Sequence, residues 1–247
     1  MLTIALVLVT IFIGSVMKGA IGIGLPLLAT PVLSIHLGVP AAIAIVAVPI
    51  VVTNIQQVVK FRAELPKQRY LVPYLIAGMV GVGAGTFVLA HAPVDVLQIG
   101  LGAAVLAYLG SRVLLPPFEV SMEESRRLGA PFGFLAGLMQ GAVGISSVVS
   151  IAFLTALKLE RPGFVGSISA MFLVLSAIQI LALLVEGTMT WERFGLGVLS
   201  LVATVVGMPI GDRLASRLSM DGFRRIIFVM LALLAALLVV SGIGALL

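Results

Sequence analysis

Cysteine is absent from this chain of 247 residues, and charged residues make up only 10% of it. Without cysteine there can be no disulfide, no thiolate nucleophile and no thiolate metal ligand. Histidine is also scarce, because His36 and His91 are the only two in the sequence, which excludes a histidine-rich metal site. An ordinary soluble domain is about 25% charged. The scarcity of charge therefore argues against a soluble fold.

Apolar sequence takes the place of the missing charge. Hydrophobic residues make up 61% of the chain, and the mean hydropathy is +1.25. A soluble interior of this size cannot hide so much apolar surface, whereas lipid can solvate it. We therefore predict an all-α polytopic integral membrane protein. The apolar start, residues 1–14, has no basic region and no small-residue cleavage signature, so we interpret it as part of the mature protein.

The net charge of +5 does not indicate a nucleic-acid partner. The basic residues occur singly or in pairs between apolar blocks, which is typical of the flanks of membrane spans. The expected partners are a small anion and membrane lipid, and the sequence does not indicate an oligomeric state.

The chain aligns with itself. A shift of 122 positions brings residues 18–24 onto 140–146, and it brings Pro40 onto Pro162 and Gln57 onto Gln179. After a small insertion the shift becomes 126, which brings 81–85 onto 207–211 and Asp95 onto Asp221. Because the matches keep their order along a whole half, we predict a first repeat over 1–113 and a second repeat over 131–247. The polar stretch between them, 114–130, is predicted to be a cytoplasmic linker.

Each half has the same layout, with a pair of short apolar segments around a glycine-rich break and three longer segments after it. The pairs are 2–17 with 25–37 and 131–140 with 147–158, and the longer segments are 41–59, 70–90 and 95–113, then 163–185, 191–211 and 222–245. A membrane span needs about 20 residues. The paired segments mostly fall short of that, so we predict re-entrant hairpins that turn at 18–24 and 140–146. The alternative is two short, tilted full spans.

The basic residues favour one topology. A hairpin returns to its starting side and three crossings follow it, so the second half enters the membrane from the opposite face and the repeats are inverted. With this segmentation every Lys and Arg except Lys18 and Arg193 falls on one face. The positive-inside rule makes that face cytoplasmic and places both termini outside the cytoplasmic (inner) membrane.

The glycine-rich breaks carry a family resemblance. The first reads Gly14-x-x-x-Lys18-Gly19-x-x-Gly22-x-Gly24-x-Pro26 with Pro31 after it, and the second reads Gly137-x-x-x-Gly141-x-x-Gly144-x-Ser146-Ser147. Together with a basic loop after the third segment, they make the chain similar to the TauE/SafE (TSUP) sulfite exporter-like family. The resemblance implies a secondary carrier for sulfite, thiosulfate, sulfoacetate, other sulfonates or carboxylates. The chain lacks the cysteines that thiosulfate-handling members carry near the pore, so we do not expect thiosulfate chemistry through cysteine.

Inverted repeats with broken helices place a substrate near the middle of the membrane, where helix N-termini offer free amide groups to an anion. The predicted substrate-binding residues are Lys18, Gly22, Gly24, Asn54, Gln57, Gln140, Gly144, Ser146, Ser147 and Gln179. An ammonium group at an intramembrane tip needs a counter-charge, which an anionic substrate would supply. The alternative is that Lys18 extends to the cytoplasmic interface.

The other candidates also have structural alternatives. Glycines at the breaks also permit close helix contact, and the polar pairs also serve as hydrogen bonds between helices. Asn54 and Gln57 are three residues apart and share one helical face, and so do their aligned counterparts Ser176 and Gln179. Thr30 and Ser150 are weaker candidates. We assign the rows Gly81-x-x-x-Gly85 and Gly207-x-x-x-Gly211 to helix packing.

The predicted function is a secondary anion transporter that works by alternating access, and the alternative is an anion-selective channel with the same central site. The sequence does not favour a membrane serine protease. Both histidines fall at the outer face, away from Ser146 and Ser147, so neither serine has a base within reach. No Asp or Glu falls deep within a predicted span. Coupling to H⁺ or Na⁺ therefore stays open, and no cofactor or metal is expected.

Overall fold

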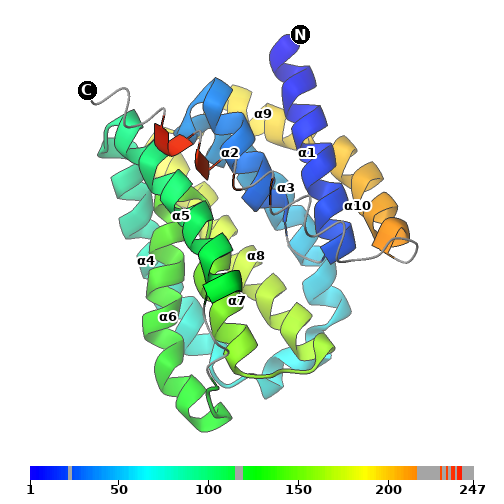
Figure 1. Ribbon diagram of the computed structural model, residues 1–247, viewed down its shortest axis with the longest axis vertical. Coiled ribbons are helices and arrows are strands. Elements are labelled where there is room, and N and C mark those ends of the chain that lie inside the picture. The colour runs from blue at the N-terminus through cyan, green and yellow to red at the C-terminus, as the bar shows by residue number, and fades with distance from the viewer. Residues whose placement is uncertain are drawn as a thin grey trace.

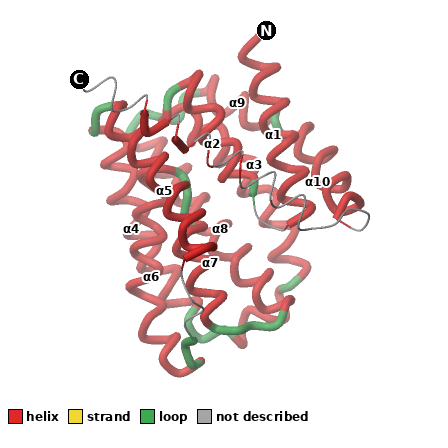
Figure 2. Tube along the Cα trace, in the orientation of Figure 1, coloured by secondary structure: helices red, strands yellow, loops and turns green. Residues whose placement is uncertain are grey.

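The computed structural model of the protein describes residues 1–21, 24–114 and 119–215, together with residues 229, 232, 235, 236 and 238–240. Within these ranges all regular structure is helical, and no strand occurs (Figures 1 and 2). The helices are α1 (Leu2–Ile21), α2 (Leu25–Leu37), α3 (Val39–Lys60), the 3₁₀ helix η1 (Arg62–Lys67), α4 (Leu71–His91), α5 (Val94–Leu114), α6 (Met122–Val143), α7 (Ser147–Ala156), α8 (Arg161–Val185), α9 (Trp191–Leu199) and α10 (Leu201–Ala215).

The prediction of an all-α protein with membrane-spanning helices is confirmed. Five helical stretches are long and apolar enough to cross a membrane, and they are Leu2–Ala20, Val39–Lys60, Leu71–His91, Pro162–Val185 and Trp191–Leu214. Shorter apolar helices cover Leu25–Leu37, Val94–Gly110 and Ser147–Ala156. Most of the predicted segment 222–245 and the candidate Gly22 lie outside the described residues.

The outgoing helix of each pair is longer than predicted. α1 has 20 residues and α6 has 22, whereas α2 has 13 and α7 has 10. At about 1.5 Å per residue, α2 and α7 rise only about 20 and 15 Å. Each pair therefore consists of one helix of spanning length and one short returning helix, and the prediction of two short outgoing arms is wrong.

The start of α6 explains most of that difference. The Ser121 hydroxyl accepts a hydrogen bond from the Glu124 amide at 3.2 Å, and a Glu124 carboxylate oxygen accepts one from the Ser121 amide at 3.1 Å. This capping box satisfies two amide groups that a helix start otherwise leaves free. α6 therefore begins at Met122, inside the stretch 114–130 that the sequence predicts as linker.

Glycine with positive φ lies at both breaks. Gly24 precedes α2 with φ 152°, and Gly144 ends α6 in the left-handed conformation with φ 72° and ψ 13°. A side chain strains the backbone in this region, so glycine can precede α2 and end α6 at low cost. The chain then reverses into the short returning helix.

Two close helix pairs form opposite sides of the molecule, α4 along α6 and α1 along α10 (Figure 1). A Cβ atom added to Gly85 would lie 2.2 Å from the carbonyl oxygen of Leu138, and one added to Gly211 would lie 2.1 Å from that of Val16. The backbones thus touch where glycine leaves room. In each pair, one helix lies before residue 114 and the other begins after residue 121.

α3 and α8 contact each other between these pairs, while α4 also contacts α8 and α9 contacts α3. The two central helices run in opposite directions, because the start of α8 lies beside the end of α3. A Cβ atom added to Gly166 would lie 3.2 Å from Cβ of Phe61, which follows α3. The described apolar core is centred on these helices.

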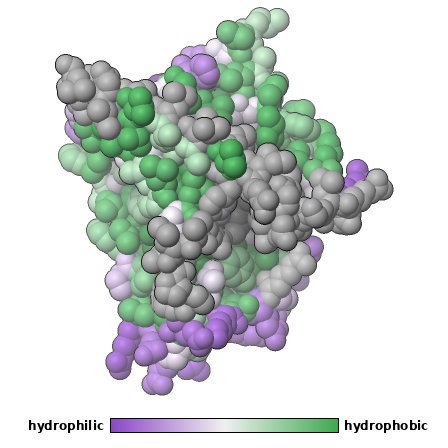
Figure 3. Space-filling view, in the orientation of Figure 1, coloured by the Kyte–Doolittle hydropathy of each residue, from purple (hydrophilic) through white to green (hydrophobic). Residues whose placement is uncertain are grey.

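Polar surface gathers at one end of the molecule. In Figure 3 most of the hydrophilic residues lie at the end where α6 begins, and hydrophobic residues make up most of the coloured surface away from it. Exposed ion pairs occur near this end, Lys67 with Glu64 and Lys158 with Glu119. This distribution is typical of a membrane protein whose apolar middle contacts lipid and whose basic loops are exposed to water.

Candidate anion site

Lys18 lies in the last turn of α1 and is buried, with 3% of its surface exposed. Its ammonium group donates hydrogen bonds to Thr53 Oγ1 at 2.8 Å and to Asn54 Oδ1 at 3.1 Å, both on α3. We call these three residues the Lys18 site. An ammonium group has three N–H donors, so one donor remains for a ligand.

α3 itself orients the two acceptors toward Lys18. The Asn54 amide nitrogen donates to the carbonyl oxygen of Ile50 at 2.7 Å, which leaves the amide oxygen free to accept. The Thr53 hydroxyl donates to the carbonyl oxygen of Pro49 at 2.8 Å, so its lone pairs are also available. Each side chain therefore uses its own hydrogens on the helix backbone and presents oxygen to the ammonium group.

Within the described ranges Lys18 has no acidic partner, since the two ion pairs found there involve Lys67 and Lys158. A buried charge is costly unless it is paired, and neutral oxygens compensate an ammonium ion only in part. A membrane protein that keeps such a charge has a ready place for an anion.

The second break holds a different set of hydrogen bonds. Gln140 Oε1 accepts from the Ser146 hydroxyl at 2.7 Å and from the Ser146 amide at 3.2 Å, while its amide nitrogen donates to Gln179 Oε1 at 2.8 Å. The Gln179 amide in turn donates to the backbone carbonyl of Gln140. We call these three residues the Gln140 cluster, and together they fasten the end of α6 to the start of α7 and to α8.

The two sets of residues lie at different levels of the molecule. A Cβ atom added to Gly144 would lie 2.9 Å from Ile43 Cγ1, so the second break packs beside Ile43 of α3. Asn54 follows Ile43 by eleven residues, which is about 16 Å of helix rise. Lys18 and Gly144 therefore contact α3 at positions that are separated along the helix.

The remaining predicted residues separate in the same way. Gln57 is not part of the Lys18 site, because its side-chain oxygen accepts a hydrogen bond from the Ser169 hydroxyl of α8 at 2.8 Å. Ser150 bonds with Tyr74 at 2.7 Å and is used in packing. Ser147, Thr30 and Ser176 are buried, and their hydroxyl oxygens find no hydrogen-bond partner among the residues that the structure describes.

Sequence reasoning missed Thr53. The only signal for it was a hydroxyl in an otherwise apolar stretch, next to Asn54. Hydroxyls in membrane helices often bond their own backbone, and Thr53 does so as well. Only the approach of α1 shows that the same oxygen also accepts from Lys18.

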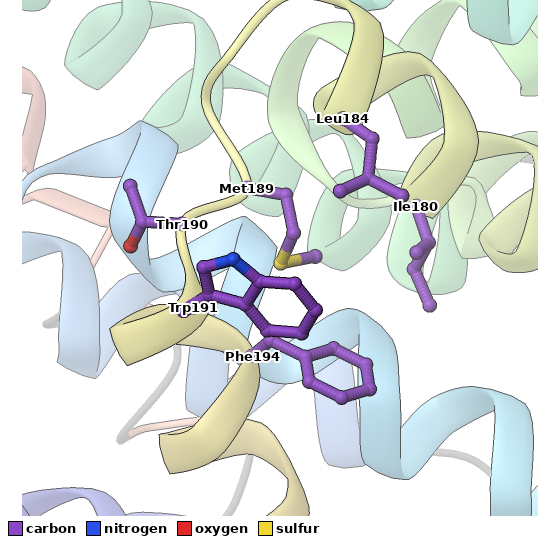
Figure 4. A pocket seen from close by; sticks show the side chains of 6 residues that line it. All are labelled: Ile180, Leu184, Met189, Thr190, Trp191 and Phe194. Atoms are coloured by element: carbon purple, nitrogen blue, oxygen red, sulfur yellow. The ribbon is translucent and has the colours of Figure 1, made fainter.

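An apolar pocket of about 530 Å³ opens between the end of α8 and the start of α9. Figure 4 shows the side chains that surround it, which are Ile180, Leu184, Met189, Thr190, Trp191 and Phe194. Trp191 is 89% exposed, as expected for an aromatic side chain at a membrane interface. With only one polar side chain in its lining, this pocket does not suit an anion.

The described part of the chain contains no group of three or more His, Asp or Glu residues able to hold a metal ion. Helices of spanning length and two glycine-broken helix pairs together define a helical multi-pass membrane protein. Comparison with known families agrees, because the sequence model of the sulfite exporter TauE/SafE family matches residues 6–238. The chain belongs to this family.

Membership makes the chain a membrane transporter rather than an enzyme, and it implies a sulfur-containing anion as the transported solute. No curated protein and no solved structure matches the chain.

Proposed function

We propose that the protein is a secondary carrier that moves a small sulfur-containing or organic anion across the cytoplasmic membrane by alternating access. Sulfite, a sulfonate such as sulfoacetate, or a related carboxylate fits this proposal. Lys18 is its principal anion ligand. The observation that carries the proposal is the burial of Lys18, whose ammonium group, among the residues that the structure describes, bonds only to the neutral oxygens of Thr53 and Asn54.

The energetics favour an anion at this site. Desolvating an ammonium ion costs several kcal/mol, and neutral hydrogen bonds recover only part of that. An oxyanion that accepts the third N–H makes a charge-assisted hydrogen bond, which contributes roughly 1.5–3 kcal/mol. Loss of this bond weakens binding by about 10- to 100-fold, since 1.4 kcal/mol corresponds to one factor of ten.

Inverted repeats are part of the proposal, and the helix contacts support them. A Cβ atom on Gly19 would meet the Met208 carbonyl at 2.2 Å, and one on Gly141 would meet the Val82 carbonyl at 2.4 Å. Gly19 corresponds to Gly141 by the shift of 122, and Val82 corresponds to Met208 by the shift of 126. The contacts at α1–α10 thus repeat those at α4–α6, as a two-fold relation between the halves requires.

The proposed orientation follows the basic residues. The hydrophilic end of the molecule, with η1 and the start of α6, faces the cytoplasm, and the N-terminus lies outside. Chemical labelling of single cysteines in intact cells tests this directly, because the chain has no cysteine of its own. A cysteine at Lys67 should be protected from an impermeant reagent, and one at Trp191 should react.

Binding measurements on purified protein test the anion site. Sulfite, sulfate, sulfoacetate, taurine and acetate are compared on wild type and Lys18→Gln, with Lys67→Gln as the matched control that removes an exposed lysine. We expect one or more of the sulfur anions to bind, Lys18→Gln to weaken it by about 10- to 100-fold, and Lys67→Gln to change nothing. Equal affinity in Lys18→Gln and wild type would eliminate the site.

Flux measurements separate a carrier from a channel with the same site. In liposomes a carrier accumulates labelled substrate by exchange with unlabelled substrate inside and saturates with concentration. A channel conducts current without such exchange. Counterflow without current supports alternating access, and current without counterflow refutes it.

A further inference from the structure

We propose that the second helix break forms a separate, uncharged anion site, made by the hydroxyls of Thr30 and Ser147 and the first amide groups of α7. This site, which we call the hydroxyl site, rests on the proposed function, because it is the second stop of the same anion. The anion passes between the Lys18 site and the hydroxyl site instead of resting in one cradle between the breaks.

The first observation is a pair of buried hydroxyls without partners. Thr30 and Ser147 are each 1% exposed, and within the described ranges neither hydroxyl oxygen has a hydrogen-bond partner. Most buried polar groups in folded proteins are hydrogen-bonded, and an unpaired one is costly. Two such groups at one break indicate a place where a ligand supplies the missing partner.

The second observation places Thr30 at this break. It lies on α2, the returning helix of the first half, yet a Cβ atom on Gly144 would be 3.5 Å from its methyl carbon Cγ2. Ser147 follows Gly144 by three residues and begins α7. Glycine at 144 therefore lets α2 approach the start of α7, and the two hydroxyls come from different halves of the chain.

The third observation concerns the backbone at the start of α7. The first amide bonded within this turn is that of Ser150, which donates to the Ser146 carbonyl. The amides of Ser147, Val148 and Val149 precede it and, in the described part of the chain, donate to no acceptor. Free amide groups at the start of a helix favour a negative ligand. Here they stand beside the unpaired Ser147 hydroxyl.

The Gln140 cluster holds this site without being its ligand. Gln140 Oε1 already accepts two hydrogen bonds, and the Gln179 amide already donates to the Gln140 carbonyl. Ser146 uses both its amide and its hydroxyl on Gln140. These side chains are satisfied with each other and fix the break, so Gln140, Ser146 and Gln179 are positioning residues.

Separation makes the two sites distinct. Gly144 packs beside Ile43, while Lys18 bonds to Thr53 and Asn54 on the same helix, about 15 Å away by helix rise. Hydrogen bonds reach about 3 Å, so one sulfite ion cannot contact both sets of donors. The Lys18 site binds through charge, whereas the hydroxyl site offers only neutral donors and releases the anion more readily.

The variant Thr30→Val/Ser147→Ala tests the proposal, with Thr30→Ser and Ser147→Thr as matched variants that keep each hydroxyl. Equilibrium binding and liposome counterflow are measured with radiolabelled sulfite and sulfoacetate, and Lys18→Gln is run beside them. We expect the double variant to bind within about threefold of wild type but to exchange about tenfold more slowly, because it lacks two neutral hydrogen bonds. The hydroxyl-keeping variants should recover most of the exchange rate that the double variant loses.

Each contrary result has its own meaning. If the double variant loses affinity as severely as Lys18→Gln, one shared cradle exists and the separate site is refuted, although the proposed function stands. If it exchanges at the wild-type rate, the hydroxyls have no part in transport and the proposal is overturned. If Lys18→Gln binds as wild type does, the proposed function fails first.

The melting temperature of each variant verifies that it is folded. Should the double variant be unstable, Ser147→Ala alone, which deletes one oxygen, repeats the test.

Discussion

The two glycine-packed interfaces resemble each other closely, whereas the two helix breaks differ. A Cβ atom added to Gly85 would lie 2.2 Å from the carbonyl oxygen of Leu138, and one added to its counterpart Gly211 would lie 2.1 Å from that of Val16. At the breaks, by contrast, Lys18 of the first half stands where the second half has Gln140. The interfaces obey one steric rule, because backbone contact tolerates only glycine. The breaks carry the chemistry, and there the two halves have diverged.

The largest expected effect concerns the interfaces. Gly85→Val and Gly211→Val place a branched side chain against a backbone carbonyl and should each cost more than about 3 kcal/mol. We expect neither variant to give monodisperse protein in size-exclusion chromatography. Gly83→Val is the control, because no described atom lies within 4 Å of a Cβ atom placed there. If only one of the two variants lost its monodisperse peak, the two interfaces would not be equivalent.

The next effect concerns the first break. Lys18→Met leaves an unbranched side chain that is one atom shorter and removes its charge, so anion affinity should fall by about 10- to 100-fold. Because an incompletely paired buried charge is removed, the melting temperature should stay the same or rise. Titration with sulfite and a thermal scan measure both quantities. A lower melting temperature with intact affinity would mean that Lys18 serves packing rather than binding.

The second break should respond in the opposite way. Gln140→Leu leaves Ser146 and Gln179 without their side-chain partner and should destabilise the protein by about 2 kcal/mol. Affinity at the Lys18 site should stay within about threefold of wild type, since the two clusters are separate. Thermal unfolding and the same sulfite titration check this. A large loss of affinity with unchanged stability would contradict the positioning role of Gln140.

The smallest effect is expected away from both breaks. Gln57→Ala removes one hydrogen bond, to Ser169, and should cost about 1 kcal/mol or less. Anion affinity should not change, because Gln57 faces α8 rather than Lys18. Ser169→Ala is the partner control and should have the same small effect. If Gln57→Ala bound the anion more weakly and Ser169→Ala did not, Gln57 would be part of the anion site.

Most helix positions were predictable. The segment 25–37 coincides with α2, and the segment 70–90 differs from α4 by one residue at each end. The start of α6 was not predicted, because residues 122–130 are polar and sequence hydropathy marks apolar spans rather than helices. The Ser121–Glu124 capping box is a local signal for that start.

The candidate site was predictable in its residues but not in its grouping. Asn54 and Gln57 share a helical face by spacing, yet Asn54 bonds to Lys18 and Gln57 bonds to Ser169. A face of α3 is wide enough to touch two neighbouring helices. Which neighbour each residue meets depends on how those helices cross, and spacing within one helix carries no such information.

Composition by itself determined that this protein is helical and lies in a membrane. Internal similarity located the glycine-rich breaks and the single lysine within them. These are properties of local sequence and of total apolar surface. The tertiary structure decided that helices from different halves pair through glycine and that Lys18 meets neutral oxygens. It also decided that Lys18 and Gly144 contact α3 at positions about 15 Å apart along that helix. Such contacts join residues far apart in the chain, and their geometry is set by how closely whole helices approach.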